Sequence, residues 1–478
     1  MNSRRNFIKK ATVLASGITI LPNFTVSGLG HKAPSDRLNI VGVGIGGKGF
    51  ANLKAMSAEN IIGLCDVDWK YAEKCFKHFP NARKYWDWRK MFDELSNSID
   101  GVMIATPDHT HAMIAARAME MGKHVYCQKP LTHSIYESRL LTKLAARHKV
   151  ATQMGNQGAS GDGVRRLCEW IWNGEIGEVR EVHTWTNRPL WPQGLERPSE
   201  KMRVPEHLKW NLFIGPATMR PYNDIYHPWN WRGWWDFGTG AFGDMACHIT
   251  DPVYRALKLS YPKKVFGTST EFNTESAPQA ETVEYSFPER ENLPKVDMPS
   301  AKLYWYDGGL LPMRSDIIPE NEDLMEDNMG GCLFVGSKDA LLCNTGGYNP
   351  RLVSGRVPRV KPQMRRIPGD TDAGYVDGPH EQDWIRACKE PPENRTETSS
   401  SFSYAGPFNE MVLLGVLAVR LKALGKPLQW DGENMKITNI SENETLKVMT
   451  SDNFKIKNGH PHFNKQYATL NALETARE

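Results

Sequence analysis

The sequence predicts an α/β protein in which a doubly wound parallel sheet is followed by an α+β domain with an antiparallel sheet. Three observations support this fold class. Short apolar strands alternate with helix-length segments between residues 38 and 154, a glycine-rich turn follows the first strand, and strand-like segments separated by Pro and Gly dominate beyond residue 257. A chain of 478 residues also exceeds what one hydrophobic core usually organises, so two domains are expected.

The first strand, residues 38–43, runs into a glycine-rich turn and then a helix-like stretch. Strand, G-x-G-x-x-G and helix in this order form the fingerprint of a Rossmann dinucleotide-binding domain. Gly44 permits the tight turn, Gly46 lets the backbone approach the pyrophosphate, and Gly49 allows close packing of the helix. A second register, Gly42, Gly44 and Gly47, also fits the pattern. The later register is preferred because it leaves a strand of normal length.

A second apolar strand, residues 60–65, ends at Asp66, about twenty residues after the glycines. A carboxylate at this place binds the adenosine ribose and repels a 2′-phosphate, so NAD is expected rather than NADP, although Lys70 offers a compensating charge. Asp68 is the alternative ribose ligand. Either Asp could instead cap the helix predicted to start near Trp69.

The alternation continues through strands at 101–105, 124–127 and 150–154. It places Thr106, Pro107 and Lys129 at carboxyl ends of strands, beside the expected cofactor. His109 and His111 at the following helix start have no further clustered ligands in the sequence, so no metal site is predicted.

Two segments carry candidate catalytic groups. Lys129 follows a buried strand and precedes Pro130, which holds it in extended geometry and directs its ammonium into the cleft. Asp244 and His248 follow a glycine-rich turn and share one helix face. A histidine can take a hydroxyl proton while a hydride leaves the same carbon, a carboxylate can orient it, and a lysine can stabilise the developing alkoxide.

The ordered set of motifs resembles the Gfo/Idh/MocA oxidoreductases between about residues 38 and 424: the glycine fingerprint, Thr106-Pro107 before a helix, Lys129-Pro130, then Asp244 and His248. The resemblance implies a Rossmann domain and a C-terminal domain whose open mixed sheet carries the substrate face and often a homo-oligomer interface. It also implies the catalytic lysine, aspartate and histidine roles for Lys129, Asp244 and His248. Gln128 replaces the family's glutamate beside the lysine.

Seven of the 15 Trp fall between residues 185 and 235, and indole faces suit sugar rings. Together with a segment similar to secreted, carbohydrate-associated members of the family, they predict a sugar or glycoside as the substrate. The candidate substrate residues are Asn187, Arg188, Trp191, Trp234, Trp235 and, at a later helix start, His380.

The first thirty residues are interpreted as a twin-arginine export signal, because Arg4-Arg5 precedes an apolar run too short to span a bilayer. The expected domains are therefore this signal (1–30), a Rossmann domain (36–156), a substrate and oligomerisation domain (157–430) and a peripheral segment (431–478). The expected location is the periplasm. A net charge of +4 without a basic block argues against nucleic-acid binding, and the eight scattered Cys are expected to be buried free thiols.

The predicted function is an NAD-dependent oxidoreductase that acts on a sugar ring hydroxyl and recycles a tightly bound cofactor internally. One alternative is a redox-assisted glycosidase, in which transient oxidation is followed by elimination and return of the hydride. A second is a non-catalytic periplasmic sugar-binding scaffold that keeps the same fold.

Overall fold

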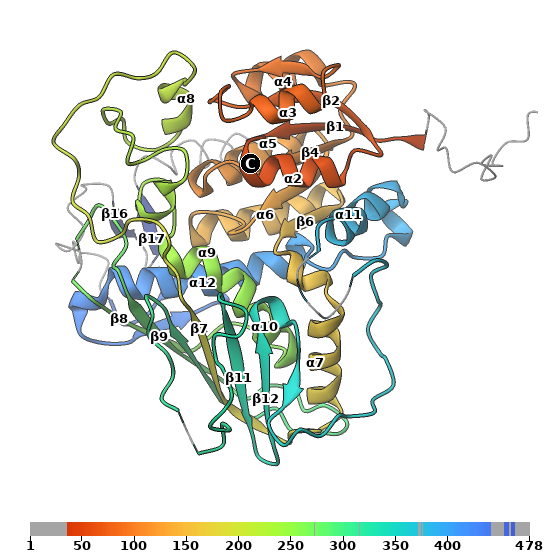
Figure 1. Cartoon of the computed structure of the whole chain (residues 1–478), viewed down its shortest axis with the longest axis vertical. Helices are drawn as coiled ribbons and strands as arrows, with labels where there is room; N and C mark the ends of the chain where they lie inside the picture. The colour runs from red at the N-terminus through yellow and green to blue at the C-terminus, as the bar shows by residue number, and fades with distance from the viewer. Residues whose placement is uncertain are drawn as a thin grey trace, which may run out of the picture.

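The computed structural model describes residues 36–271, 273–314, 316–370, 374 and 376–440, together with the backbone of two short strands, β16 (Phe454–Lys457) and β17 (His460–Phe463). The predicted export signal lies outside the described residues, as does most of the segment after residue 440. Figure 1 shows two sheets with a layer of helices between them.

The first sheet is parallel throughout, with the strand order β3-β2-β1-β4-β5-β6. Its strands are β1 (Asn39–Val43), β2 (Asn60–Cys65), β3 (Arg83–Tyr85), β4 (Gly101–Ile104), β5 (His124–Gln128) and β6 (Thr152–Gly155). Helices α2 (Gly47–Ala55), α3 (Glu73–His78), α4 (Trp88–Leu95), α5 (Asp108–Glu120) and α6 (Ile135–His148) connect them. The strand order reverses between β1 and β4, which is where a doubly wound sheet binds its ligand.

The second sheet has nine strands in the order β13-β12-β11-β7-β10-β9-β8-β14-β15. They are β7 (Val179–Thr186), β8 (Lys264–Ser269), β9 (Glu281–Phe287), β10 (Ala301–Tyr306), β11 (Gly330–Gly336), β12 (Ala340–Asn344), β13 (Arg351–Leu352), β14 (Leu428–Asp431) and β15 (Lys436–Ile437). Strands β7 and β10 pair in parallel, whereas the other neighbours are antiparallel. The expected two-domain fold with a mixed second sheet is confirmed.

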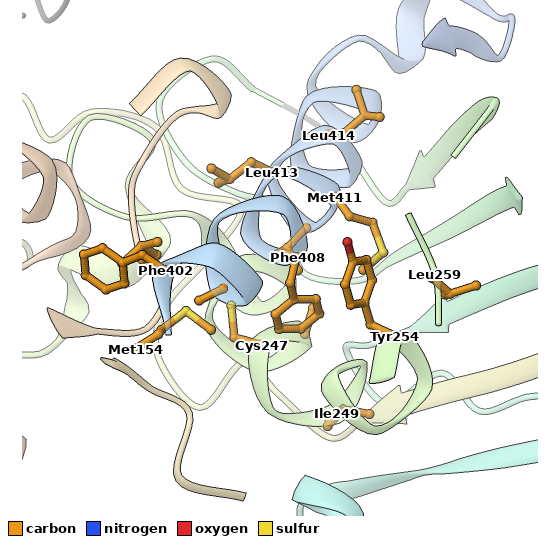
Figure 2. Packing of buried hydrophobic residues seen from close by; sticks show 14 of the residues in the cluster. Met154, Cys247, Ile249, Tyr254, Leu259, Phe402, Phe408, Met411, Leu413 and Leu414 are labelled. Atoms are coloured by element: carbon orange, nitrogen blue, oxygen red, sulfur yellow. The ribbon is translucent and has the colours of Figure 1, made fainter. Parts of the chain in front are cut away.

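The main core lies between the two sheets, where α12 (Phe402–Arg420) packs against α6 of the first domain and against α9 (Gly240–Ile249) and β8 of the second. Figure 2 shows Phe408 and Met411 of α12 beside Tyr254 of α10 (Asp251–Ala256), with Cys247 of α9 close by. Among the described helices, α12 alone has the length and apolar character of a membrane span, and 83% of its most apolar window is buried inside the molecule. The helix therefore serves as the core of this interface.

Helix α11 (Pro379–Lys389) lies within the stretch assigned to the second domain, yet it packs into the first (Figure 1). The Trp384 indole is fully buried against Tyr126 of β5 and covers Gly101, where an added Cβ would approach the ring to 2.8 Å. The hydrophobic cluster of β1, β2 and β4 is thus completed by a helix more than 200 residues away in the sequence.

All eight cysteines are free and buried, as expected from their positions in strands and helices.

Candidate active site

The glycine turn has the shape that close approach of a phosphate group requires. Gly44 has φ +74°, and an added Cβ there would lie 2.6 Å from the backbone of Ala105. A Cβ at Gly49 would overlap the carbonyl oxygen of Gly44, and one at Gly46 would overlap the ring of Tyr71. Helix α2 begins directly after this turn, so its N-terminus opens on the cleft. These features fit the pyrophosphate of a dinucleotide.

Asp66 is buried at the end of β2, where the sequence predicts a ribose ligand. Its Oδ2 accepts N–H groups from Ile45 (2.8 Å) and Gly46 (3.1 Å), and its Oδ1 accepts the Asp68 N–H (2.9 Å). Burial raises the pKa of Asp66, although these hydrogen bonds oppose the shift. The Asp66 carboxylate therefore stabilises the glycine turn through hydrogen bonds and also lines the cleft.

A segment of the second domain, residues 207–232, lies over this cleft, and we call it the roof. Two backbone hydrogen bonds join the roof to the loop after β2: Trp69 N–H donates to His207 (3.0 Å), and Lys209 N–H donates to Val67 (2.9 Å). The cleft wall from the first domain includes Gly44, Gly46, Asp66, Tyr71, Trp86, Trp88, Arg89, Thr106 and Pro107, and the roof contributes Leu212, Phe213, Gly215, His227, Pro228, Trp229, Trp231 and Arg232. Both domains thus enclose the cofactor position.

Asp68 secures the roof instead of binding within the cleft. His227 Nε2 lies 2.8 Å from Asp68 Oδ2, and His207 Nδ1 lies 3.0 Å from Asp68 Oδ1. The same Oδ1 accepts the N–H groups of Lys70 and Tyr71, so Asp68 caps a turn, whereas the helix predicted to start near Trp69 begins at Glu73. Burial opposes ionisation, but hydrogen bonds and the two histidines lower the pKa of Asp68.

Lys129 and Arg232 both contact Asp244, and Arg232 lines the cleft, although neither Lys129 nor Asp244 lines it. The Lys129 ammonium donates to Asp244 Oδ1 (2.7 Å) and to the Asp244 carbonyl (2.9 Å), and Arg232 Nε donates to the same Oδ1 (3.3 Å). Despite burial, the charges of Lys129 and Arg232 lower the pKa of Asp244 to about 2. Asp244 is therefore an ionised counter-ion shared by two cations.

His248 lies on the same helix, α9, one turn after Asp244, as predicted. Its imidazole is half-buried and has no hydrogen bond to the described residues, whereas Lys129 and Arg232 both donate to Oδ1 of Asp244. Burial first, then the Lys129 charge, lowers the pKa of His248 to about 3. The expectation that Asp244 orients the histidine is thus replaced by a neutral imidazole that is free to accept a proton.

A second buried carboxyl group near Lys129 and Asp244 is that of Asp108, the first residue of α5. Thr239, in the glycine-rich turn before α9, donates to Asp108 Oδ2 (2.9 Å). Burial and the charge of Asp244 raise the pKa of Asp108 to about 7. Asp108 therefore links the helix after Thr106-Pro107 to the turn that carries Asp244.

The two histidines near the start of α5 contact carbonyl groups. His109 lies against the Phe213 (3.0 Å) and Phe237 (3.3 Å) carbonyls, and His111 lies between those of Thr106 (2.7 Å) and Pro130 (2.8 Å). His109 thereby ties the roof to the first domain. Within the described part of the chain, neither belongs to a group of three or more potential metal ligands.

Two family models cover the two domains. Residues 37–156 match the Gfo/Idh/MocA oxidoreductase family's NAD-binding Rossmann fold, and residues 178–287 match the C-terminal alpha/beta domain of the same family. Both domains of the chain thus match models of the Gfo/Idh/MocA oxidoreductase family. The first domain is therefore the NAD-binding domain that the glycine turn and Asp66 indicated.

Curated relatives of this family match over part of their length. Glucose-6-phosphate 3-dehydrogenase of Bacillus subtilis is 28% identical over 29% of this chain and 39% of its own, and levoglucosan dehydrogenase of Pseudarthrobacter phenanthrenivorans is 27% identical over 39% and 40%. A glycosyl hydrolase family 109 protein of Shewanella sp. MR-4 is 25% identical over 37% of this chain and 44% of its own. The matched stretch spans about two fifths of the length of each.

Solved structures share the fold over most of the chain. A WlbA dehydrogenase from Bordetella pertussis, crystallised with NADH and UDP-GlcNAcA, has a TM-score of 0.54 at 14% identity and covers 83% of this chain and 99% of its own. Levoglucosan dehydrogenase in complex with NADH has a TM-score of 0.53 at 17% identity, and the match covers 80% of this chain and 97% of that one.

Several substrate residues expected from the sequence lie away from this family's cofactor cleft. Trp234 and Trp235 are buried core side chains, and Trp191 is buried with its N–H on Gln193. Asn187 and Arg188 bond each other and the loops at 308 and 328. His380 is buried between Ser160 (2.6 Å) and the Met154 carbonyl (2.8 Å). None of them lines the cleft.

The cleft uses other residues of the same tryptophan-rich segment. Trp229 is 48% exposed, and Trp231 and Arg232 line the cleft beside it. The seven clustered Trp indicated this stretch of the sequence, but the spacing of aromatic residues does not tell which indoles face outward. Tyr71 and Asp108 were also missed, since each depends on contacts with a distant turn.

Proposed function

We propose that this protein oxidises a ring hydroxyl of a sugar or glycoside and transfers the hydride to NAD held in the interdomain cleft. The observation that supports the proposal most directly is the Lys129–Asp244 contact of 2.7 Å beside half-buried His248, joined to the cleft through Arg232. Relatives named as sugar dehydrogenases support the same class of substrate.

When bound, NAD supplies the hydride acceptor. The protein's residues manage the proton and the charge: neutral His248 accepts the hydroxyl proton at a ring nitrogen, and the Lys129 ammonium donates a hydrogen bond to the oxygen as negative charge develops there. Asp244 keeps the Lys129 side chain oriented, and the roof excludes water from the cleft.

We further propose that the protein is exported folded with its cofactor already bound, and that it retains that cofactor between turnovers. The Arg4-Arg5 motif motivates the export proposal, because an exported enzyme that released its cofactor would find no dependable nicotinamide pool. The roof and its Asp68 contacts support retention. A homo-oligomer formed through the nine-stranded sheet belongs to the same proposal.

The test is to purify the native protein, dialyse it extensively, denature it and measure the released nicotinamide. We expect close to one equivalent of NAD per chain, followed by oxidation of at least one member of a glycoside panel. Much less than one equivalent, with activity restored only by added NAD, would overturn the retention proposal. A non-catalytic scaffold would bind sugar without any turnover.

The second candidate is a redox-assisted glycosidase, which the glycosyl hydrolase family 109 relatives favour. This activity uses the same Lys129, His248 and NAD, and returns the hydride after elimination. An assay with p-nitrophenyl glycosides and no added electron acceptor distinguishes the glycosidase from the dehydrogenase. Continued release of nitrophenol supports the glycosidase, whereas absence of release together with acceptor-dependent oxidation supports the dehydrogenase.

A further inference from the structure

Arg232 has a free donor edge at the site where the reacting sugar is proposed to bind. It lies in the 3-10 helix η3 (Asn230–Gly233), lines the cleft and keeps 18% of its side chain exposed. Its Nε donates to Asp244, and its Nη1 donates to the Trp229 carbonyl (3.2 Å). Its Nη2 has no acceptor within the part of the chain that the structure describes.

The guanidinium is held rigidly in this position. Its carbon lies 4.0 Å from the centre of the Trp229 ring and 4.3 Å from that of Trp231, so two indoles flank it. The backbone of Arg232 also packs on Gly238, where an added Cβ would come within 2.6 Å of the Arg232 carbonyl oxygen. An arginine fixed by aromatic rings and a tight turn is preorganised to bind an anion.

The charges around Arg232 leave positive charge available to a ligand. Lys129 and Arg232 both contact the single oxygen Oδ1 of Asp244, so two cations share one carboxylate. Burial and Asp244 raise the pKa of the nearby Asp108 to about 7, so that carboxyl group is only partly charged near neutrality. The cleft surface beside the reacting groups therefore favours a negatively charged substrate.

We propose that Arg232 forms an anion subsite that binds the carboxylate or phosphate group of an acidic sugar, while exposed Trp229 provides an apolar face for the ring. This inference rests on the proposed function and specifies its substrate class. Because Lys129 and Arg232 converge on one oxygen, a hydroxyl at Lys129 and an anionic group at Arg232 fit on the same sugar. A charged hydrogen bond of this kind should give the acidic sugar a preference of at least about 10-fold.

The experiment measures binding to the NAD-loaded protein by calorimetry, so it does not depend on turnover. Methyl glucuronide, methyl galacturonide and glucose 6-phosphate are each compared with the neutral counterpart. We expect at least one acidic sugar to bind about 10-fold more tightly, Arg232→Gln to reduce that ratio to about 2-fold or less, and Arg232→Lys to keep part of it. Arg180→Gln, on β7 and outside the cleft, should leave the ratio unchanged.

Three results would overturn the subsite. The first is no preference for any acidic sugar. The second is a preference that Arg232→Gln leaves intact while kcat falls equally for acidic and neutral sugars, since Arg232 would then act only by positioning Asp244. The third is loss of bound NAD in Arg232→Gln with an unchanged sugar ratio, which would assign the guanidinium to the cofactor's pyrophosphate. Preferential binding of an acidic sugar without any oxidation would support the subsite and refute the proposed function.

Discussion

The ammonium of Lys129 donates to two oxygens of Asp244, the side-chain Oδ1 at 2.7 Å and the backbone carbonyl at 2.9 Å. Lys129 comes from the end of a strand in the first domain, and Asp244 comes from a helix of the second. This contact joins the cofactor domain to the substrate domain at the reacting groups, so domain packing and catalytic geometry depend on each other.

Lys129→Ala should lower kcat by at least about 100-fold, the scale of a lost electrostatic contact to a developing alkoxide. Bound NAD should remain, because the glycine turn and Asp66 are unchanged. Steady-state kinetics and nicotinamide release after denaturation measure the two quantities. A near-normal kcat would remove Lys129 from the mechanism.

His248→Ala should reduce kcat to a similar extent, by about 100-fold, with partial rescue at high pH where hydroxide can replace the lost base. Since burial and Lys129 lower the pKa of His248 to about 3, its protonation should not limit kcat/KM of the native enzyme above about pH 4. Parallel pH profiles of both proteins provide the test. Equal rates throughout would rule out His248 as the base.

Gly49→Ala should purify with less than about a tenth of the native NAD content, because the added methyl group overlaps the Gly44 carbonyl oxygen and displaces the turn from α2. Gly122→Ala is the control. Unlike Gly49, Gly122 has a positive φ (+73°), so alanine there adds backbone strain, but nothing lies within 4 Å of the added Cβ. Full NAD content in both variants would contradict the assignment of the turn to the pyrophosphate.

His227→Ala should speed NAD release by about 10-fold, because it removes a charge-assisted hydrogen bond between the roof and Asp68. The rate of NAD release is measured by trapping the free cofactor during dialysis. His183→Ala, on β7 of the second sheet, is the control because it leaves every contact between roof and cleft in place. Equal release rates in the two variants would show that the roof does not retain the cofactor.

His124 should make the folded protein less stable in acid. Its Nδ1 accepts the Ala151 N–H (3.0 Å), and burial lowers its pKa from 6.5 to about 4. The unfolded chain therefore binds more protons between pH 6.5 and 4, so the stability from this group is present above about pH 6.5 and is lost as the pH falls through that window. His124→Gln should reduce the pH slope of the unfolding free energy by up to about 1.4 kcal/mol per pH unit. Urea unfolding at several pH values measures the slope, and an unchanged slope would contradict the prediction.

Much of the first domain was predictable from the sequence because its strands are short, apolar and bounded by turns. The predicted strand at residues 60–65 is β2, and Asp66 follows it as expected. The predicted helix face carrying Asp244 and His248 is part of α9. Local periodicity and a fixed motif spacing are properties of neighbouring residues, so the sequence carries them directly.

The sequence alone determined the Rossmann fingerprint, the strand-end position of Lys129 and the one-turn separation of Asp244 from His248. Only the tertiary structure decided that Asp244 binds Lys129 and Arg232 instead of His248, that α11 completes the first domain, and that Trp229 faces the cleft while Trp234 is buried. These outcomes depend on contacts between residues that are distant in the chain or that differ only in how they pack. Local composition and hydrophobic periodicity do not encode such contacts or packing differences. Which side chains are buried depends on which surfaces of the two domains pack together.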